Sequence, residues 1–172
     1  MIEFDLDYFK EISEEIFTTD SPTGFTNNVI NLIKSKIEEM GYSCNIMNNG
    51  ALEVFVKGAD DSKTVATSAH CDTLGLMVRS IKSNGTLALT TLGGPIVPTL
   101  DGEYCKVYTR DGRVYTGTIL CNSPATHVYK DAGTKERNID NMEVRLDEII
   151  HSLKDVEALG IQNGDIVCYD PK

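Results

Sequence analysis

The stretch from Thr64 to Val78, with the sequence TVATSAHCDTLGLMV, constrains the fold of this chain more than any other. Between Val65 and His70 every second side chain points to the same side, which is the period of a β-strand. The side chains are small and several are β-branched, as in a strand that is buried on both faces of an α/β sheet. The pattern therefore predicts a central strand that ends near His70.

Two polar side chains, His70 and Asp72, stand where this strand should end. Ligands of open α/β sheets bind at the carboxyl ends of strands. A neutral imidazole can bind a metal through one ring nitrogen while a nearby carboxylate holds the other N–H, which fixes the tautomer and raises the basicity of the ligand. The spacing is therefore compatible with a metal ligand and its orienting carboxylate. A hydrogen-bonded structural histidine is the alternative, and the spacing alone leaves both interpretations open.

Length and composition indicate a soluble globular protein. The 172 residues suffice for one full domain or two small ones, and 41% hydrophobic with 24% charged residues is the usual mix of a globular chain. No apolar run approaches the roughly 18 residues of a membrane helix, so we expect no membrane partner. Residues 1–17 are acidic and amphipathic and lack the basic start of a signal peptide, which predicts a cytoplasmic location.

Charge and cysteine usage argue against further classes of function. The formal net charge is −10 and no basic patch with interleaved aromatic residues is present, so we expect no nucleic-acid partner. Five cysteines without a CxxC pair argue against a disulfide framework and against a structural zinc site. Cys71, between the two candidate site residues, could be a metal ligand or a nucleophile. Strand alternation favours a small apolar packing residue instead.

The rest of the sequence predicts an α/β opening followed by a β-rich module. Periodic apolar residues predict a helix over 5–17 and a second helix that ends before Gly41. Two hairpin turns, Asn84-Gly85 and Asp111-Gly112, lie in a span of short strands typical of a small β-barrel or sandwich. The expected strands cover 42–46, 52–57, 76–82, 86–91, 106–109, 113–120, 143–147 and 166–169, with a helix over 152–159, an exposed loop over 129–141, and Val107, Val114 and Ile119 in the core.

Three segments resemble one known family. SAHCDTLGLMV, from Ser68 to Val78, resembles the AHxDEIGLMV segment of the M42 family of metallo-aminopeptidases, which includes glutamyl aminopeptidases, endoglucanase-M and tetrahedral aminopeptidases. SPTGFTNNV is similar to the family's PGxSGxE-type turn before its second helix, and ALGIQNGDIVCYD is similar to its LGIxxGDxVxxD segment. The ordered series covers about residues 5–170.

This resemblance implies an α/β fold class: a partial three-layer, phosphorylase/hydrolase-like peptidase domain interrupted by a β-barrel-like dimerisation module. Residues 1–74 are then the first part of the peptidase domain, residues 75–163 the inserted oligomerisation module, and residues 164–172 the return into the truncated peptidase domain. A partial sheet leaves strand edges and apolar faces uncovered, so we expect a homo-oligomer that associates through the β module.

The resemblance also implies a hydrolase, an aminopeptidase that releases N-terminal residues from peptides with a free α-amine. Enzymes of this family hold two divalent metal ions, commonly zinc or cobalt, and a carboxylate base activates the attacking water. Carried over by position, His70 is a ligand of one metal, and Asp72 is the catalytic-site carboxylate that orients it. This agrees with the spacing argument.

Two departures from the family pattern limit what the chain can do by itself. Thr73 stands where the family usually has glutamate, and the family's remaining ligands and its catalytic glutamate lie beyond the point that matches Lys172. One histidine cannot hold a catalytic zinc, which takes about three protein ligands plus water. We therefore expect these 172 residues to bind no metal tightly and to have no peptidase activity alone.

Two other interpretations stay open. The chain could be a non-catalytic oligomerisation or binding protein that keeps the β module, or it could belong to another di-metal peptidase family with the same α/β core. Two glycine-turn hairpins directly after the His70–Asp72 segment favour M42 over the M20 and M28 families. The family also has a histidine at the place of His127, which we expect to be a hydrogen-bonded loop residue and not a ligand.

Overall fold

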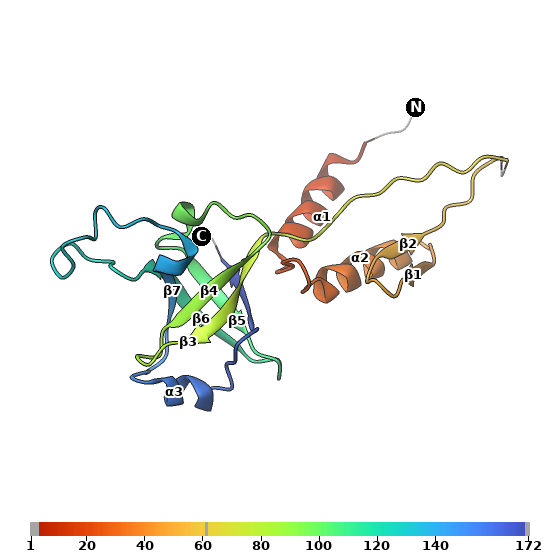
Figure 1. Ribbon diagram of the computed structural model, residues 1–172. Helices are drawn as coiled ribbons and strands as arrows, with labels where there is room; N and C mark the ends of the chain where they lie inside the picture. The colour runs from red at the N-terminus through yellow and green to blue at the C-terminus, as the bar shows by residue number, and fades with distance from the viewer. Residues whose placement is uncertain (1–3, 61, 171–172) are drawn as a thin grey trace. The chain divides into compact units, whose positions relative to one another are not determined.

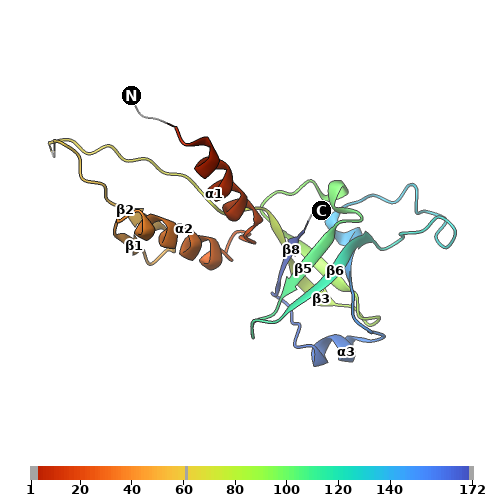
Figure 2. The same cartoon turned by 180° about the vertical axis from the view of Figure 1, so that it is seen from behind.

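The computed structural model describes residues 4–60 and 62–170 of the chain, in two units (Figures 1 and 2). The first unit covers Met1–Thr73 and the second covers Leu74–Lys172. The fold is mixed α/β, with two helices and a small hairpin in the first unit and a closed β-barrel in the second. None of the helices in the described ranges combines the length and the apolar composition that a membrane span requires.

Two helices, α1 (Leu6–Thr18) and α2 (Asn27–Glu39), make up most of the first unit and confirm the two predicted from periodicity. The Asp5 carboxylate accepts a hydrogen bond from the backbone N–H of Tyr8, as an N-cap residue does, so α1 begins there. α2 ends before Gly41, whose φ of +86° is the left-handed conformation that terminates many helices.

A short antiparallel hairpin follows, made of β1 (Cys44–Ile46) and β2 (Leu52–Val54). Its register pairs Cys44 with Val54 and Ile46 with Leu52. The prediction of two strands here is confirmed, but β2 ends three residues earlier than the alternation to residue 57 suggested. A strand forms only where its backbone can hydrogen-bond to a neighbouring strand, and β2 pairs with the three residues of β1.

The central strand predicted over residues 64–70 is wrong for this structure. The segment is extended (Figure 1) but belongs to no strand, and within the described part of the chain its backbone makes no hydrogen bond. Val65 is 89% exposed, the opposite of the burial that its position in the pattern predicted. Alternation gives a segment the potential to be a strand, but a ladder forms only where another strand lies beside it.

The second unit is a closed barrel with the strand order β3-β4-β7-β6-β5-β8. All six strands fall where the sequence predicted strands, and neighbours are antiparallel throughout. Closure pairs every strand on both sides, so the barrel has no open edge. The strands are β3 (Gly75–Ile81), β4 (Leu87–Leu92), β5 (Tyr104–Tyr108), β6 (Val114–Cys121), β7 (Met142–Leu146) and β8 (Ile166–Tyr169).

The barrel is closed by β8, which corrects the expected boundary at residue 164. β8 pairs with β3 through Val167 opposite Leu76, and with β5 through Tyr169 opposite Cys105. Val167 is fully buried in the core. The last strand therefore completes the β module and does not return to another domain, because its two hydrogen-bonding edges are both taken up by barrel strands.

Alternate side chains of the strands point inward and fill the barrel. On β6, Ile119 and Cys121 are fully buried, whereas Val114 is 48% exposed, so its prediction as a core residue was wrong. Val114 is an odd number of residues from Ile119 and therefore lies on the opposite face of the strand. The largest fully buried side chains of this unit are Leu76, Val78, Leu87, Leu89, Val107, Ile119, Met142, Val144, Val156, Ile161 and Val167.

Three short helical segments connect the strands. They are η1 (Val97–Leu100), η2 (Ile139–Asn141) and α3 (Leu153–Ala158). A capping box is present at the start of α3, since the Asp155 carboxylate accepts hydrogen bonds from the backbone N–H groups of His151 and Ser152. These bonds, with that from His151 the larger contribution, hold the pKa of the Asp155 carboxyl below its usual value.

The loop between β6 and η2 projects from the barrel (Figure 1) and is exposed at its tip, as predicted. Its base is held by two cations. Lys135 Nζ donates to the buried Ser123 hydroxyl at 3.0 Å, and Arg137 donates to the Asp101 carboxylate at 3.0 Å and to the Ala132 carbonyl at 2.8 Å. The prediction of a polar loop is therefore confirmed, and its base is fixed by side-chain hydrogen bonds that no periodicity reveals.

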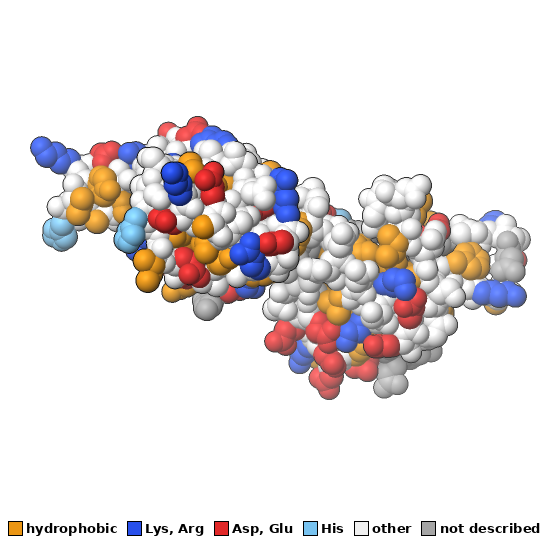
Figure 3. All heavy atoms as spheres, turned by 90° about the horizontal axis from the view of Figure 1, so that it is seen from below, with side chains coloured by type: hydrophobic (Ala, Val, Ile, Leu, Met, Phe, Trp, Pro, Cys, Tyr) orange, Lys and Arg blue, Asp and Glu red, His pale blue; other side chains and the backbone are white. Residues whose placement is uncertain are grey.

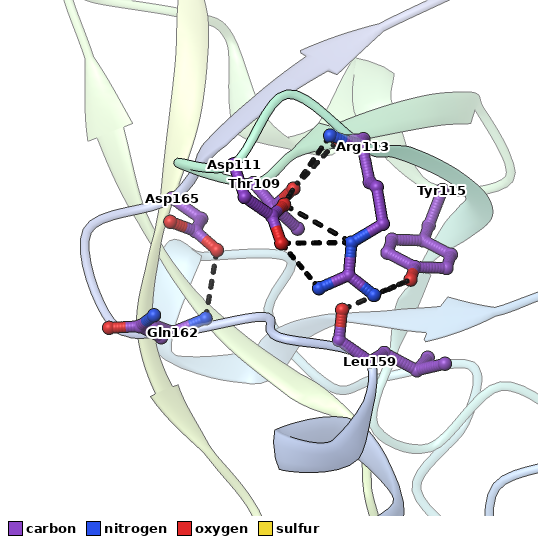
Figure 4. Close-up of polar contacts among 7 residues, drawn as sticks. All are labelled: Thr109, Asp111, Arg113, Tyr115, Leu159, Gln162 and Asp165. Carbon is purple, nitrogen blue, oxygen red and sulfur yellow. Dashed lines mark hydrogen bonds and ion pairs between the residues drawn. The ribbon is translucent and has the colours of Figure 1, made fainter.

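A polar cluster links the β5–β6 turn to the segment after α3 (Figure 4). The Arg113 guanidinium donates to both carboxylate oxygens of Asp111 and to the Tyr115 hydroxyl, which in turn donates to the Leu159 carbonyl. The side chain of Asp165 beside it is fully buried, and one of its oxygens accepts the backbone N–H of Gln162 at 2.8 Å. Desolvation by this burial raises the pKa of Asp165.

Replacing Asp165 with asparagine should change how the stability of the barrel depends on pH. A raised folded pKa means that the folded state binds more protons than the unfolded state, so the wild type loses stability as pH rises from about 4 through the raised value. Asparagine keeps an acceptor oxygen for the Gln162 N–H but does not titrate. Urea unfolding between about pH 4 and 7 should show Asp165→Asn gaining stability relative to wild type as pH rises, and parallel curves would contradict this.

Candidate metal-ligand site

His70 and Asp72 lie against each other, as the spacing predicted. His70 Nδ1 is 3.1 Å from Asp72 Oδ1 and 3.2 Å from the Asp72 carbonyl oxygen. Both oxygens are acceptors, so Nδ1 carries the proton and donates, which leaves the lone pair of Nε2 available. The imidazole is 86% exposed at its side chain. This arrangement places the Asp72 carboxylate behind one ring nitrogen of His70 and leaves the other ring nitrogen open.

The Asp72 carboxylate is itself held by Thr23. The Thr23 hydroxyl donates to Asp72 Oδ2 at 2.6 Å, and this hydrogen bond is the largest contribution that holds the pKa of Asp72 below its usual value. Asp72 is therefore ionised at neutral pH, with one oxygen toward His70 and the other toward Thr23. The role of Thr23 was not predicted from the sequence, because nothing in the local pattern of SPTG indicates a partner 49 residues away.

The backbone around the pair is clamped to the turn between α1 and α2. The buried Ser21 hydroxyl donates to the Cys71 carbonyl at 3.1 Å, and the Thr73 N–H donates to the Ser21 carbonyl at 2.8 Å. Pro22 and Thr73 form an isolated parallel bridge. Thr73, which stands where the resemblance implies a glutamate, thus takes part through its backbone. The clamp fixes the position of His70 and Asp72 relative to the turn even though residues 64–70 are unpaired.

The Cys71 thiol is half-buried, and burial is the main cause that raises its pKa. A raised pKa disfavours the thiolate, the form that a nucleophile or a metal ligand needs. This supports the packing interpretation of Cys71.

The other histidines do not join the pair in a metal centre. His127 and His151 both belong to the barrel unit, and the described residues contain no group of three or more potential His, Cys, Asp or Glu ligands. His127 is an exposed residue of the projecting loop, and its role as a hydrogen-bonded loop residue stays a prediction. Within the described residues, the pair His70 and Asp72 thus has no third potential ligand beside it.

The chain is a mixed α/β protein with a closed six-stranded barrel, and its candidate site is a histidine whose ring is held by a carboxylate. The family described as M42 glutamyl aminopeptidase matches residues 50–172. The chain therefore belongs to the M42 glutamyl aminopeptidase family, whose members are in general metal-dependent aminopeptidases.

Individual relatives agree with this assignment. The chain is 45% identical over 162 residues to YhfE of Bacillus subtilis (strain 168), a match that covers 94% of this chain and 47% of YhfE. It is 26% identical over 151 residues to the glutamyl aminopeptidase of Lactococcus lactis subsp. cremoris (strain MG1363), covering 84% of this chain and 41% of that protein. The chain thus spans less than half the length of these relatives.

Solved structures share the fold. The aminopeptidase APDkam598 from the archaeon Desulfurococcus kamchatkensis superposes with a TM-score of 0.82 at 27% identity, covering 95% of this chain and 43% of that chain. A TET aminopeptidase from a marine sediment archaeon, Thaumarchaeota archaeon SCGC AB-539-E09, gives a TM-score of 0.81 at 23% identity, covering 95% of this chain and 44% of that chain. The partial peptidase architecture expected from the resemblance is confirmed.

Proposed function

We propose that this chain supplies the first half of a di-metal aminopeptidase site, in which His70 is one metal ligand and Asp72 orients it. The observation that carries the proposal is the 3.1 Å contact from His70 Nδ1 to Asp72 Oδ1, which leaves an exposed imidazole with a free nitrogen. The substrates would be peptides with a free N-terminus, whose first peptide bond is hydrolysed. Two divalent ions, zinc or cobalt, would supply the Lewis acidity that activates water.

The residues present fit one ligand position and do not make a complete centre. A catalytic zinc takes about three protein ligands, and the described ranges hold no group of that size. The role of the chain's own residues is therefore to present the His70 imidazole as one ligand and to orient its ring. Thr23 keeps Asp72 ionised and in place, Asp72 keeps the proton on His70 Nδ1, and the remaining ligands come from polypeptide beyond these 172 residues.

We also propose that the protein acts as a homo-oligomer that associates through the barrel, in the cytoplasm. Structural neighbours that share the fold at 18% identity form large assemblies: PhTET1-12s is a dodecamer, and the TET1 peptidase of Pyrococcus horikoshii can assemble into a tetrahedron or a large octahedral shell. The five cysteines are all free, which suits a reducing compartment.

One alternative has a specific observation in its favour. The barrel has a complete core and no open edge, whereas the first unit carries a single metal-ligand candidate. A non-catalytic oligomerisation or binding protein would need the complete barrel but would not need a metal ligand. The two functions differ in whether His70 and Asp72 matter for activity once the rest of a peptidase is supplied.

A chimera tests the catalytic proposal. The 172-residue chain alone should not hydrolyse an aminoacyl-p-nitroanilide with added zinc or cobalt, whereas its covalent fusion to the part of YhfE outside the match should. In the fusion, Asp72→Asn should lower metal affinity or activity about 10–100-fold, because it removes the carboxylate behind the ligand. Asp60→Asn, on an exposed aspartate of the same unit whose carboxylate accepts hydrogen bonds from Ser62, is the matched control. Equal effects of the two substitutions, or hydrolysis by the chain alone, would overturn the proposal.

A further inference from the structure

The dipeptide Asn-Gly occurs three times, each time in a turn, at Asn49, Asn84 and Asn163. In such a pair the backbone nitrogen of glycine can attack the side-chain carboxamide of asparagine, because no Cβ blocks its approach. The nitrogen forms a bond to the asparagine Cγ as ammonia leaves, and water then opens the resulting ring at either carbonyl. The products are aspartate and isoaspartate, so each conversion adds one negative charge.

Asn49 and Asn84 occupy the same position in the same kind of turn. In the β1–β2 turn the N–H of Gly50 donates to the carbonyl three residues earlier at 2.9 Å, and Gly85 makes the same bond at 2.9 Å in the β3–β4 turn. The two glycines have φ angles of +85° and +84°. The two sites therefore share their local chemistry and differ in what surrounds them.

The β3–β4 turn is held closed by the rest of the barrel. Gly85 is buried, and a Cβ on it would lie 2.1 Å from Ile150 Cγ2. The Asn84 Oδ1 accepts hydrogen bonds from both the N–H and the hydroxyl of Thr86. The flanking strands are paired on both sides in the closed barrel. Rotation of Asn84 toward the glycine nitrogen therefore requires the barrel to open locally.

The β1–β2 turn has no comparable support. Asn49 is exposed, and a Cβ on Gly50 would meet nothing within 4 Å. The Asn49 Oδ1 accepts the N–H of Ala51 at 3.1 Å. The two strands pair at three positions, and among the described residues their sheet contains no further strand. A two-stranded hairpin is marginally stable in water, so this turn opens at a low free-energy cost.

The third pair is fixed at the point where β8 enters the barrel. The N–H of Gly164 donates to the Val78 carbonyl at 2.8 Å, and the N–H of Val78 donates to the Asp165 carbonyl at 2.9 Å. The Asn163 carbonyl accepts a hydrogen bond from Arg110 at 3.0 Å. Attack by the Gly164 nitrogen would break its bond to β3, so we expect this pair to be protected like that at Asn84.

We infer that Asn49 is a site of spontaneous covalent modification, where the folded protein loses ammonia and gains aspartate and isoaspartate. The new carboxylate joins the first unit, on which acidic side chains gather in the view of Figure 3. Residues 1–73 hold half of the acidic residues of the chain but fewer than a third of the basic ones. Like-charge repulsion and the extra backbone carbon of isoaspartate therefore weaken the hairpin further. This modification is independent of the catalytic function proposed above, because it needs neither a metal nor a substrate.

Peptide mapping of the purified 172-residue chain during storage in mildly alkaline buffer tests this site. Mass spectrometry follows the replacement of the amide NH2 by OH, and an isoaspartate-specific methyltransferase detects the isomer. Asn49 should convert at least tenfold faster than Asn84 and Asn163, because its turn opens more easily. In concentrated urea the three rates should become similar, since glycine follows each asparagine.

A matched pair of variants isolates Asn49. Glutamine would have to close a larger ring, which forms much more slowly. The acidic species that accumulates on anion exchange should therefore disappear in Asn49→Gln and remain unchanged in Asn84→Gln. Both substitutions lie at exposed positions, so the circular dichroism of both variants should match that of the wild type.

Each outcome decides the inference. Fast conversion at Asn49 that extends to all three sites in urea supports it. Conversion of Asn84 or Asn163 at the rate of Asn49 in the folded chain overturns it. A preference for Asn49 that persists in urea also overturns it, because the preference would then come from the local sequence and not from the fold. A folded chain that keeps Asn49 intact while the unfolded chain converts overturns it as well.

Discussion

Replacing Ile119 with alanine is expected to lower the free energy of unfolding of the barrel by about 2–5 kcal/mol. Ile119 is fully buried on β6, opposite Val144 of β7, and it belongs to the cluster that fills the barrel. Truncation removes three buried carbon atoms and leaves a cavity in a closed shell. Every barrel strand is hydrogen-bonded to a neighbour on both sides. The strands can therefore move only partly inward to fill the cavity.

Urea unfolding followed by circular dichroism measures this loss, because the chain has no tryptophan. Ile149→Ala is the matched control, since Ile149 lies in the same unit but is 88% exposed, and its cost should stay within about 0.5 kcal/mol. Similar costs for the two substitutions would show that the barrel interior is not packed as described.

Replacing Gly85 with alanine should destabilise the barrel by about 2–5 kcal/mol, the sum of a backbone cost and a steric cost. Gly85 sits in the β3–β4 turn with a φ of +84°, which an L-residue rarely adopts. A Cβ there would lie 2.1 Å from Ile150 Cγ2 and 3.1 Å from the Ser152 carbonyl oxygen. Ile150 cannot simply swing aside, because its Cγ2 is attached next to the backbone.

Gly112 separates the two costs. It occupies the β5–β6 turn with a φ of +85°, and a Cβ there would meet nothing within 4 Å. Gly112→Ala should therefore cost only the backbone part, about 1–2 kcal/mol. Adding Ile150→Ala to Gly85→Ala should recover part of the steric cost, and a double variant no better than the sum of its single variants would refute the clash.

In the candidate site, some contacts follow from the local sequence and others depend on residues far away in the chain. The separation of His70 and Asp72 by one residue was compatible with a contact between the two side chains, and the structure has that contact. The turn that holds them was outside the reach of the same reasoning, because Ser21 and Thr23 bond to Cys71 and Asp72 across about fifty residues. The local sequence of a short segment indicates its own geometry, but it does not indicate which distant segment will pack against it.

The sequence by itself determined the helices, the turns and the positions of the barrel strands along the chain, since each depends on periodicity, glycine conformation and capping over a few residues. Only the tertiary structure decided which strands found neighbours. β8 was drawn into the barrel by its pairing with β3 and β5, while the better-patterned segment from Thr64 to His70 stayed unpaired. The physical reason is that a strand's hydrogen bonds are made with another part of the chain, so strand pattern is local but strand formation is not.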